Sequence, residues 1–324
     1  MAALLAGLLA ALLAGSANAR PPTAADELGA ALKTLKAKHI NRAQADWPVL
    51  ERLARSLLPR QGKPEDAYPA IRAVIGALGV KHTFLITRDE WKAEMTGHAQ
   101  GHARPDAMTP PQFRLLPGQI GYVHIAAFIG SAQAVTAYEA RFGRSMIVLR
   151  QQGACRYVVD LRGNGGGNMW PMLNGVASLL GDPPFGFFEP GSDPGEVWTV
   201  KNGEVQSVDA DIDRVPAYSP KRSGPHVAVL VDSATASSGE FTAMAFEGRD
   251  GVRIFGQPTA GFVTANDLFS LPDGAEMAVT VSGAQDRLHR RHRDRIVPDV
   301  ATPPGPATDA AALAWLRTTP CKAK

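Results

Sequence analysis

The sequence predicts an α/β protein with a largely parallel sheet, preceded by a small helical unit. From residue 119 onward, strand-like apolar runs alternate with helix-like runs, which is typical of βα units. Residues 26–79 show helical periodicity without intervening strands. Two of the predicted strands run directly into Gly-rich or Ser-rich turns. In open α/β sheets ligands bind at such strand ends, so the fold class indicates where a site is expected.

The chain begins with an apolar stretch, residues 1–19, that ends in Ala17-Asn18-Ala19. This small-x-small ending fits a signal-peptidase site. The stretch is short for a membrane span, which needs about 20 apolar residues. We expect a cleaved secretory signal, a mature chain from Arg20 and no stable membrane insertion after cleavage. The alternative is a retained N-terminal anchor.

Residues 20–79 predict an N-terminal helical domain. The runs DELGAALKTLKAKH, DWPVLERLARSLL and EDAYPAIRAVIGALG each place apolar residues at helical spacing. Gly79 is a plausible C-cap for the last of them.

Residues 80–317 predict a core with alternating strands and helices. A polar, Gly/Pro-rich linker around 96–113 interrupts it and includes His98 and His102, although Gly and Pro near them argue against a helical metal site. Near the C-terminus, FSLPDGAEMAVTVSG reads as a hairpin that turns at Asp273-Gly274.

The charge distribution argues against nucleic-acid binding, and the cysteine content allows one disulfide. The net charge is +3, and the basic run 287–295 has no interleaved aromatic residue, so we expect no nucleic-acid partner. We interpret that run as a solvated loop, with phosphate or substrate-carboxylate contact as the alternative. Cys155 and Cys321 are the two cysteines, and neither lies in a CxxC pattern. An oxidising compartment would permit one bridge between them, but the sequence leaves the pairing open.

The first chemistry-bearing junction is VVDLRGNGGGN, residues 158–168. It has neither the Lys-Ser/Thr of a phosphate-binding P-loop nor the GxGxxG spacing. Adjacent glycines expose backbone N–H groups and adopt positive φ, which suits an oxyanion hole. A tight strand-to-helix turn explains the glycines equally well.

The second junction is VLVDSATASSGEF, residues 229–241, where Ser237 and Ser238 precede a helix-like run. A helix N-terminus stabilises nearby negative charge, which suits a nucleophile. Helix N-capping is the alternative use of these serines. The run matches neither the GxSxG nor the SxxK serine pattern.

Taken together, DLRGNGGG, VLVDSATASSGE and GQPTAGF resemble the tail-specific, or C-terminal processing, serine peptidase family. The resemblance covers roughly residues 28–300 and is strongest to a subgroup without a PDZ domain that includes nisin-resistance peptidases. It implies a ClpP/crotonase-like α/β core. The tricorn core and interphotoreceptor retinoid-binding protein belong to the same superfamily, so the resemblance is also compatible with a binding protein.

The resemblance assigns roles residue by residue. Ser237 matches the family nucleophile, Gly166 and Gly167 lie in the loop that donates an oxyanion N–H, and Ser238 would supply the second donor. Many members carry a lysine base after the PTxG turn, but this chain has Phe262 there, which cannot accept a proton.

A histidine replaces the lysine in the subgroup, and the block Val80-Lys81-His82-Thr83 matches it. His82 is therefore the expected general base, with a strand-end histidine satisfied by a backbone contact as the alternative. Glu240 matches an acidic position of the subgroup. It could orient a substrate amine or His82, or stabilise the first turn of the helix.

The sequence thus predicts a periplasmic or secreted serine peptidase that cleaves peptide or protein substrates, near the C-termini of envelope or secreted peptides. No metal or organic cofactor is implied. The alternative is a non-catalytic binding protein for a hydrophobic ligand or peptide on the same scaffold.

Overall fold

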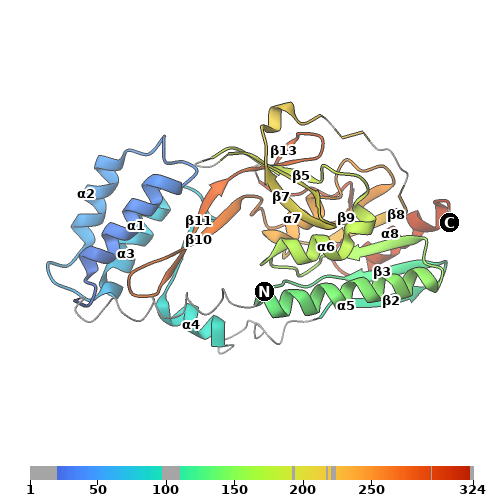
Figure 1. Ribbon diagram of the computed structural model, residues 1–324, viewed down its shortest axis with the longest axis horizontal. Helices are drawn as coiled ribbons and strands as arrows, with labels where there is room; N and C mark the ends of the chain where they lie inside the picture. Colours follow the sequence, from blue (N-terminus) through green and yellow to red (C-terminus); the bar gives the residue numbers. More distant parts are fainter. Residues whose placement is uncertain are drawn as a thin grey trace, which may run out of the picture.

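The structure is a computed structural model that describes residues 20–96, 110–191, 194–216, 218–219, 224–292 and 294–321. The predicted signal at 1–19 and most of the predicted linker, including His98 and His102, lie outside these residues. Figure 1 shows a smaller helical body and a larger α/β body, joined by a long β-hairpin. No helix within the described ranges is long and apolar enough to cross a membrane.

The smaller body starts with helices, as predicted. They are α1 (Ala24–Lys38), α2 (Trp47–Leu57), the 3-10 turn η1 (Pro64–Ala67) and α3 (Tyr68–Ala77). Thr23 begins α1 with a capping box, because its hydroxyl accepts the Asp26 N–H while the Asp26 carboxylate accepts the Thr23 N–H. Gly79 lies just beyond α3 with φ of 74°, a conformation that favours glycine after a helix.

These helices pack on a three-stranded antiparallel sheet that comes from both parts of the sequence. Its strands are β1 (Phe84–Ile86), β11 (Glu276–Ser282) and β10 (Ala265–Ser270), in that order. Strands β10 and β11 form the predicted hairpin. Met277 and Val279 of β11 share one hydrophobic core with Leu28 and Ile71 of the helices. The predicted division into domains at residues 79 and 80 stays a prediction.

The larger body is built on a six-stranded sheet, parallel except for one edge strand. The order is β14 (Val300–Ala301), β9 (Val252–Gly256), β8 (His226–Val231), β4 (Arg156–Asp160), β3 (Ile120–His124) and the antiparallel β2 (Gln112–Leu116). This confirms the sheet expected from the alternating pattern.

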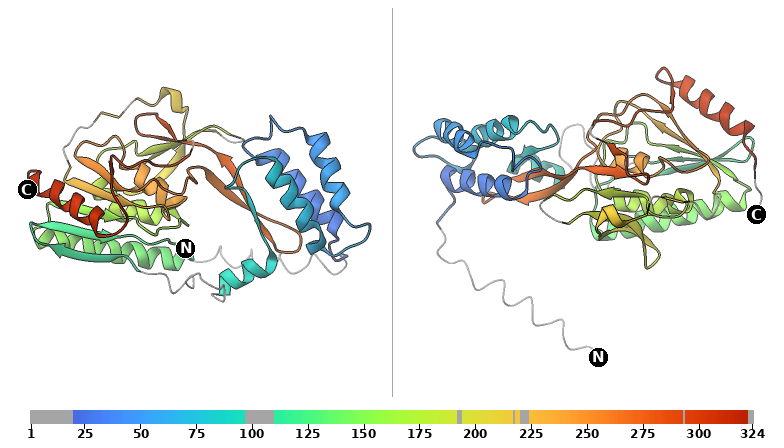
Figure 2. Two further views of the ribbon diagram at one scale, coloured as in Figure 1. Left: turned by 180° about the vertical axis from the view of Figure 1, so that it is seen from behind. Right: turned by 90° about the horizontal axis from the view of Figure 1, so that it is seen from above.

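Helices cover both faces of this sheet, as the right-hand view of Figure 2 shows. One face carries α5 (Ala132–Gln151), α6 (Met169–Leu180) and α7 (Ser238–Met244), and the other carries α8 (Pro306–Thr318). Val227 and Val229 of β8 belong to the hydrophobic core under α5, α6 and α7. Ala228 and Leu230 belong to the core under α8. Burial on both faces explains the unbroken apolar run of this strand.

A second sheet of the larger body was not predicted. Its order is β13 (Arg291–His292), β12 (Ala284–Asp286), β5 (Gly186–Phe188), β6 (Glu196–Lys201) and β7 (Glu204–Asp209). The remaining elements are α4 (Arg88–Thr96) and the 3-10 turn η2 (Ile212–Arg214).

The interpretation of residues 287–295 as a solvated loop was wrong for Arg287, which is fully buried. Its guanidinium donates to the carbonyl oxygens of Leu180 and Ala245, at the C-terminal ends of α6 and α7. Cations are stabilised at helix C-termini, where carbonyl groups lack partners within the helix. The buried arginine therefore ties together two helices that flank the candidate site.

The two cysteines meet in the structure. A disulfide joins Cys155, at the start of β4, to Cys321, which follows α8, with 5.4 Å between the two Cα atoms. It fastens the last helix to the central sheet. The pairing that the sequence left open is thus present.

Candidate active site

The two chemistry-bearing turns lie side by side at the carboxyl ends of β4 and β8. Parallel strands end at one edge of the sheet, and β4 pairs directly with β8. The Ala236 N–H donates to the Asn164 carbonyl at 2.8 Å, which links the serine turn to the glycine loop. A Cβ placed on Gly166 would lie 2.8 Å from the Ser237 Cβ, so only glycine leaves room for Ser237 here.

Ser237 is the N-cap of α7 and has a strained backbone. Its φ of 50° and ψ of −120° lie outside the regions that residues with a Cβ ordinarily adopt. Such a conformation costs on the order of 1–3 kcal/mol and is most often found at functional sites. The strain presents the side chain of Ser237 at the end of the helix, facing the glycine loop.

The glycine loop offers a free amide at Gly167. The Gly166 N–H already donates to Asn164 Oδ1 at 2.9 Å. In the described part of the chain, the N–H groups of Gly167 and Ser238 donate to no acceptor. The Ser238 hydroxyl donates to the Gly167 carbonyl at 2.5 Å, so the loop and the helix are held against each other.

The Glu240 carboxylate is fully buried and holds the serine turn against the PTAG turn. One oxygen, Oε2, accepts the Ser237 N–H at 2.9 Å and the Phe262 N–H at 2.7 Å. The other, Oε1, accepts the Gly261 N–H at 2.8 Å and the Thr259 hydroxyl. Of the roles considered from sequence, these contacts support a positioning role at the start of the helix.

We expect Glu240→Gln to lower both stability and activity, because the amide nitrogen must face two hydrogen-bond donors whichever oxygen it replaces. Leaving such buried donors unsatisfied costs about 1–3 kcal/mol. The midpoint of denaturant unfolding and the turnover should both be lower in Glu240→Gln than in the wild type. The exposed control Glu204→Gln should match the wild type in both. An unchanged unfolding midpoint for Glu240→Gln would contradict this account of the carboxylate.

His82 lies just before β1 and is buried. Its Nδ1 lies 2.8 Å from the Thr264 hydroxyl oxygen, and its ring centroid lies 5.0 Å from that of Phe262. The pKa of His82 is lowered to about 4, mainly by burial; the contact with Thr264 opposes this shift, and the Lys81 ammonium contributes a smaller lowering. At neutral pH the imidazole is therefore uncharged.

The structure brings His82 and Ser237 into one neighbourhood without a direct hydrogen bond between them among the described residues. Phe262 links them, because its ring packs on His82 and its N–H shares the Glu240 oxygen that holds the Ser237 N–H. Phe262 thus contacts His82 through its ring and the Glu240 carboxylate through its backbone N–H.

Two further residues at this site escaped the sequence analysis. Thr264 contacts His82, and Asn164 organises the glycine loop through Gly166 and the Ile125 carbonyl. A hydroxyl residue shortly after the PTAG turn was the available signal for Thr264, and the sequence offers many such residues. Asn164 stands within the quoted glycine motif, but its side-chain contacts involve another strand end.

A network of hydrogen bonds and ion pairs around Asp160 supports the glycine loop at the end of β4. Asp160, at the end of β4, accepts from the Tyr122 hydroxyl at 2.7 Å and from the Arg162 guanidinium at 2.6 Å. Burial alone would raise the pKa of Asp160, but these donors lower it, so the carboxylate stays charged. Arg162 also pairs with Asp309 of α8 at 3.0 Å. The loop is thereby fixed to two strands and a helix.

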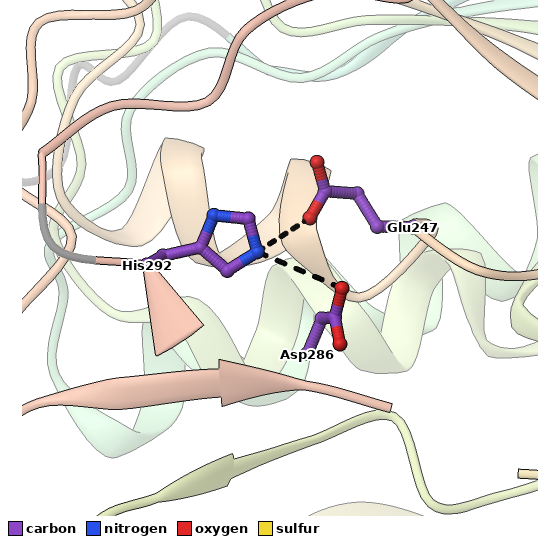
Figure 3. Close-up of side chains that lie close together, drawn as sticks. All are labelled: Glu247, Asp286 and His292. Atoms are coloured by element: carbon purple, nitrogen blue, oxygen red, sulfur yellow. Dashed lines mark ion pairs between the residues drawn. The ribbon is translucent and has the colours of Figure 1, made fainter. Parts of the chain in front are cut away.

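The described residues include one group with the composition of a metal site, Glu247, Asp286 and His292 (Figure 3). Their donor atoms lie within 4.8 Å of one another. His292 Nε2 lies 2.7 Å from a Glu247 oxygen and 3.7 Å from an Asp286 oxygen, and Arg290 pairs with the same Asp286 oxygen at 2.6 Å. With His292 protonated, two cations balance two carboxylates, so the cluster is also stable as an ionic network.

We expect this cluster to make stability depend on alkaline pH. Burial opposes protonation of His292, but Asp286 and Glu247 raise its pKa to about 9. A raised folded-state pKa stabilises the fold fully below the unfolded value near 6.5, and that contribution is lost as pH rises through about 9. The loss should be on the order of 1–3 kcal/mol once solvent screening is allowed for.

Denaturant unfolding between pH 6 and pH 10 measures this dependence. His292→Gln should be less stable than the wild type at pH 6 and should approach it at pH 10. A constant difference between the two proteins across this range would show that His292 does not titrate as described.

Comparisons with known proteins address the family. The family model for peptidase family S41 matches residues 119–302, which is more than half of the chain. The nisin-resistance protein of Lactococcus lactis subsp. lactis is 26% identical over 299 residues, covering 92% of this chain and 88% of that protein. A carboxyl-terminal-processing protease of Picosynechococcus is 29% identical over 191 residues, covering 58% of this chain and 40% of that protein.

Two solved structures share the fold. A lipoprotein from Streptococcus agalactiae superposes with a TM-score of 0.73 at 20% identity, covering 94% of this chain and 99% of that one. The photosystem II D1 C-terminal processing protease superposes with a TM-score of 0.58 at 18% identity, covering 89% and 95%. The sequence match over both chemistry-bearing turns, joined to this shared fold, places the chain in peptidase family S41 as a serine-type peptidase.

Proposed function

We propose that the protein is an exported serine peptidase that forms an acyl-enzyme on Ser237 with His82 as general base. The observation that carries this proposal is the strained backbone of Ser237 at the N-terminus of α7, facing the glycine loop with its free Gly167 amide. Strain of this kind persists only where the surroundings impose it, and Glu240 imposes it here through the Ser237 N–H.

His82 can act as a base through its Nε2. When Nδ1–H donates to Thr264, the lone pair of Nε2 remains to accept the Ser237 hydroxyl proton. Thr264 is then the residue that orients the base. Because His82 and Ser237 are not hydrogen-bonded in this structure, the catalytic contact tightens when substrate binds, as is common for enzymes without bound substrate.

The proposed reaction uses these groups in sequence. Ser237 Oγ attacks the peptide carbonyl carbon as its proton passes to His82, and the N–H groups of Gly167 and Ser238 bind the oxyanion. We assign Gly167 rather than Gly166 because the Gly166 amide is held by Asn164. His82 gives the proton to the leaving amine as the C–N bond breaks, and water, deprotonated by His82, hydrolyses the acyl-enzyme.

Export and the substrate class rest on separate observations. The signal-like residues 1–19 and the Cys155–Cys321 disulfide both support an oxidising compartment outside the cytoplasm. The names of the relatives, a nisin-resistance protein and carboxyl-terminal-processing proteases, support peptide substrates cleaved near their C-termini. We propose envelope or secreted peptides as the substrates.

A peptide-cleavage experiment tests this proposal. Mature protein from Arg20 is incubated with a mixed peptide library, and new C-termini are identified by mass spectrometry, with Ser237→Ala as the matched control. New termini should lie a few residues before the original ends and should require Ser237. Internal cleavage without preference for the ends would overturn the proposed specificity, and equal cleavage by Ser237→Ala would overturn the proposed mechanism.

A further inference from the structure

Lys81 and Phe262 form a layer beside His82. The Lys81 Nζ lies 4.7 Å from the centroid of the Phe262 ring and 3.2 Å from the Ala260 carbonyl oxygen, to which it donates. The same Phe262 ring lies 5.0 Å from the ring of His82. An ammonium over an aromatic face is attracted to it, so the contact holds the lysine and the ring together.

This layer has two effects on the imidazole. The Phe262 ring excludes water from one side of His82, and removal of water disfavours the charged imidazolium. The Lys81 ammonium, on the residue directly before His82, repels a second positive charge. Both effects favour the uncharged form, which is the form that can accept a proton.

The other charged groups near His82 do not cancel this effect. Strand β1 carries apolar residues only, α7 contributes Glu240, and β10 contributes Asp267. Strand β11 contributes Glu276, which lies opposite Ile86 and accepts from the Ser270 hydroxyl. Glu240 accepts from four donors, and three of them, on Thr259, Gly261 and Phe262, belong to the turn that carries Phe262. Asp267 is exposed to solvent, and so is Lys81, so solvent weakens the charge of each and burial under the Phe262 ring is the larger effect.

We propose that Lys81 and Phe262 are positioning residues that keep His82 uncharged, so that the peptidase stays active in mildly acidic surroundings. This inference rests on the proposed role of His82 as general base. Position 262, which carries a lysine in related peptidases, thus has a different role here. The Phe262 ring shields His82 from water, and Lys81 supplies a positive charge from another segment.

An NMR titration of His82 tests the inference without any substrate. The Cε1–H signal of His82 is followed from pH 3.5 to pH 8 in the Ser237→Ala protein, and is assigned by its disappearance in His82→Ala. We expect a midpoint near 4 in the parent protein. Lys81→Met should raise it by about half a pH unit and Phe262→Ala by about one unit or more. Lys81→Arg should preserve the midpoint, and the exposed control Lys201→Met should not change it.

Two controls make the outcome decisive. Phe262→Leu keeps an apolar side chain, so it should raise the midpoint less than Phe262→Ala and serves where the alanine variant fails to fold. Added salt should raise the midpoint more in the parent than in Lys81→Met, because only the parent has the repulsion by Lys81 for salt to weaken. Titrations are read only over the pH range in which circular dichroism is constant.

Failure of the inference differs from failure of the proposed function. A midpoint near 6.5 in the parent, or midpoints that neither Lys81→Met nor Phe262→Ala changes, would overturn the inference whatever His82 does in catalysis. Where the substitutions shift the NMR midpoint of His82 as expected, the same substitutions made in the protein that retains Ser237 should shift the acid limb of kcat/KM equally. A limb that stays in place while the midpoints move would show that His82 is not the base, and the proposed function would fail instead.

Discussion

Ser237→Ala should lower kcat by about 10⁴-fold or more, because no other described hydroxyl occupies the strained N-cap of α7 beside the glycine loop. Residual hydrolysis would come from binding and from the Gly167 and Ser238 amides alone. The fold should be unchanged, because the contact with Glu240 is made by the backbone N–H of residue 237, which alanine retains. Turnover of a cleaved peptide and the thermal midpoint together measure both expectations.

Ser238→Ala is the natural comparison. Its hydroxyl donates to the Gly167 carbonyl, so the substitution should loosen the loop and reduce turnover modestly, by about tenfold. If Ser237→Ala kept near-wild-type turnover while Ser238→Ala lost it, the nucleophile would be the neighbouring serine.

His82→Ala should lower kcat/KM by about 10²–10⁴-fold, the usual contribution of general-base catalysis. In the wild type, kcat/KM should rise with pH as His82 loses its proton, because only the neutral imidazole accepts one. An unperturbed histidine would place this limb near pH 6.5, but burial and Lys81 lower the pKa of His82 to about 4, so the limb should lie there. His82→Ala should lack the limb, and an unchanged profile would assign proton abstraction to another group.

The parallel sheet and the two turns at its edge could be predicted because they depend on local patterns. Each strand of the larger sheet is followed by its own helix or turn, so alternation of apolar runs identified both the fold and the junction at Ser237. The five-stranded sheet could not be predicted in this way. Its strands β5 and β12 are three residues long and lie about a hundred residues apart in the chain. Neither is long enough to show the alternation of apolar and polar residues that identifies a strand.

The candidate site shows the same limit. The serine and glycine turns were visible as motifs, whereas His82 required the family resemblance. Thr264 and the burial of Arg287 depend on contacts between distant segments, 182 residues apart in the case of Thr264 and His82. The choice of Gly167 over Gly166 as the proposed oxyanion amide has a similar origin, since the Asn164 side chain occupies the N–H of Gly166.

Fluorophosphonate labelling followed by peptide mapping tests the central claim most directly, because the reagent reacts far faster with an activated serine than with an ordinary one. The mature protein should acquire one phosphonyl group on the peptide that contains Ser237. Labelling should be absent in Ser237→Ala and slowed by about 10²-fold or more in His82→Ala, since the base that activates the hydroxyl is missing. A wild-type protein that remains unlabelled, as a binding protein on this scaffold would, or one labelled at a different serine, would contradict the account.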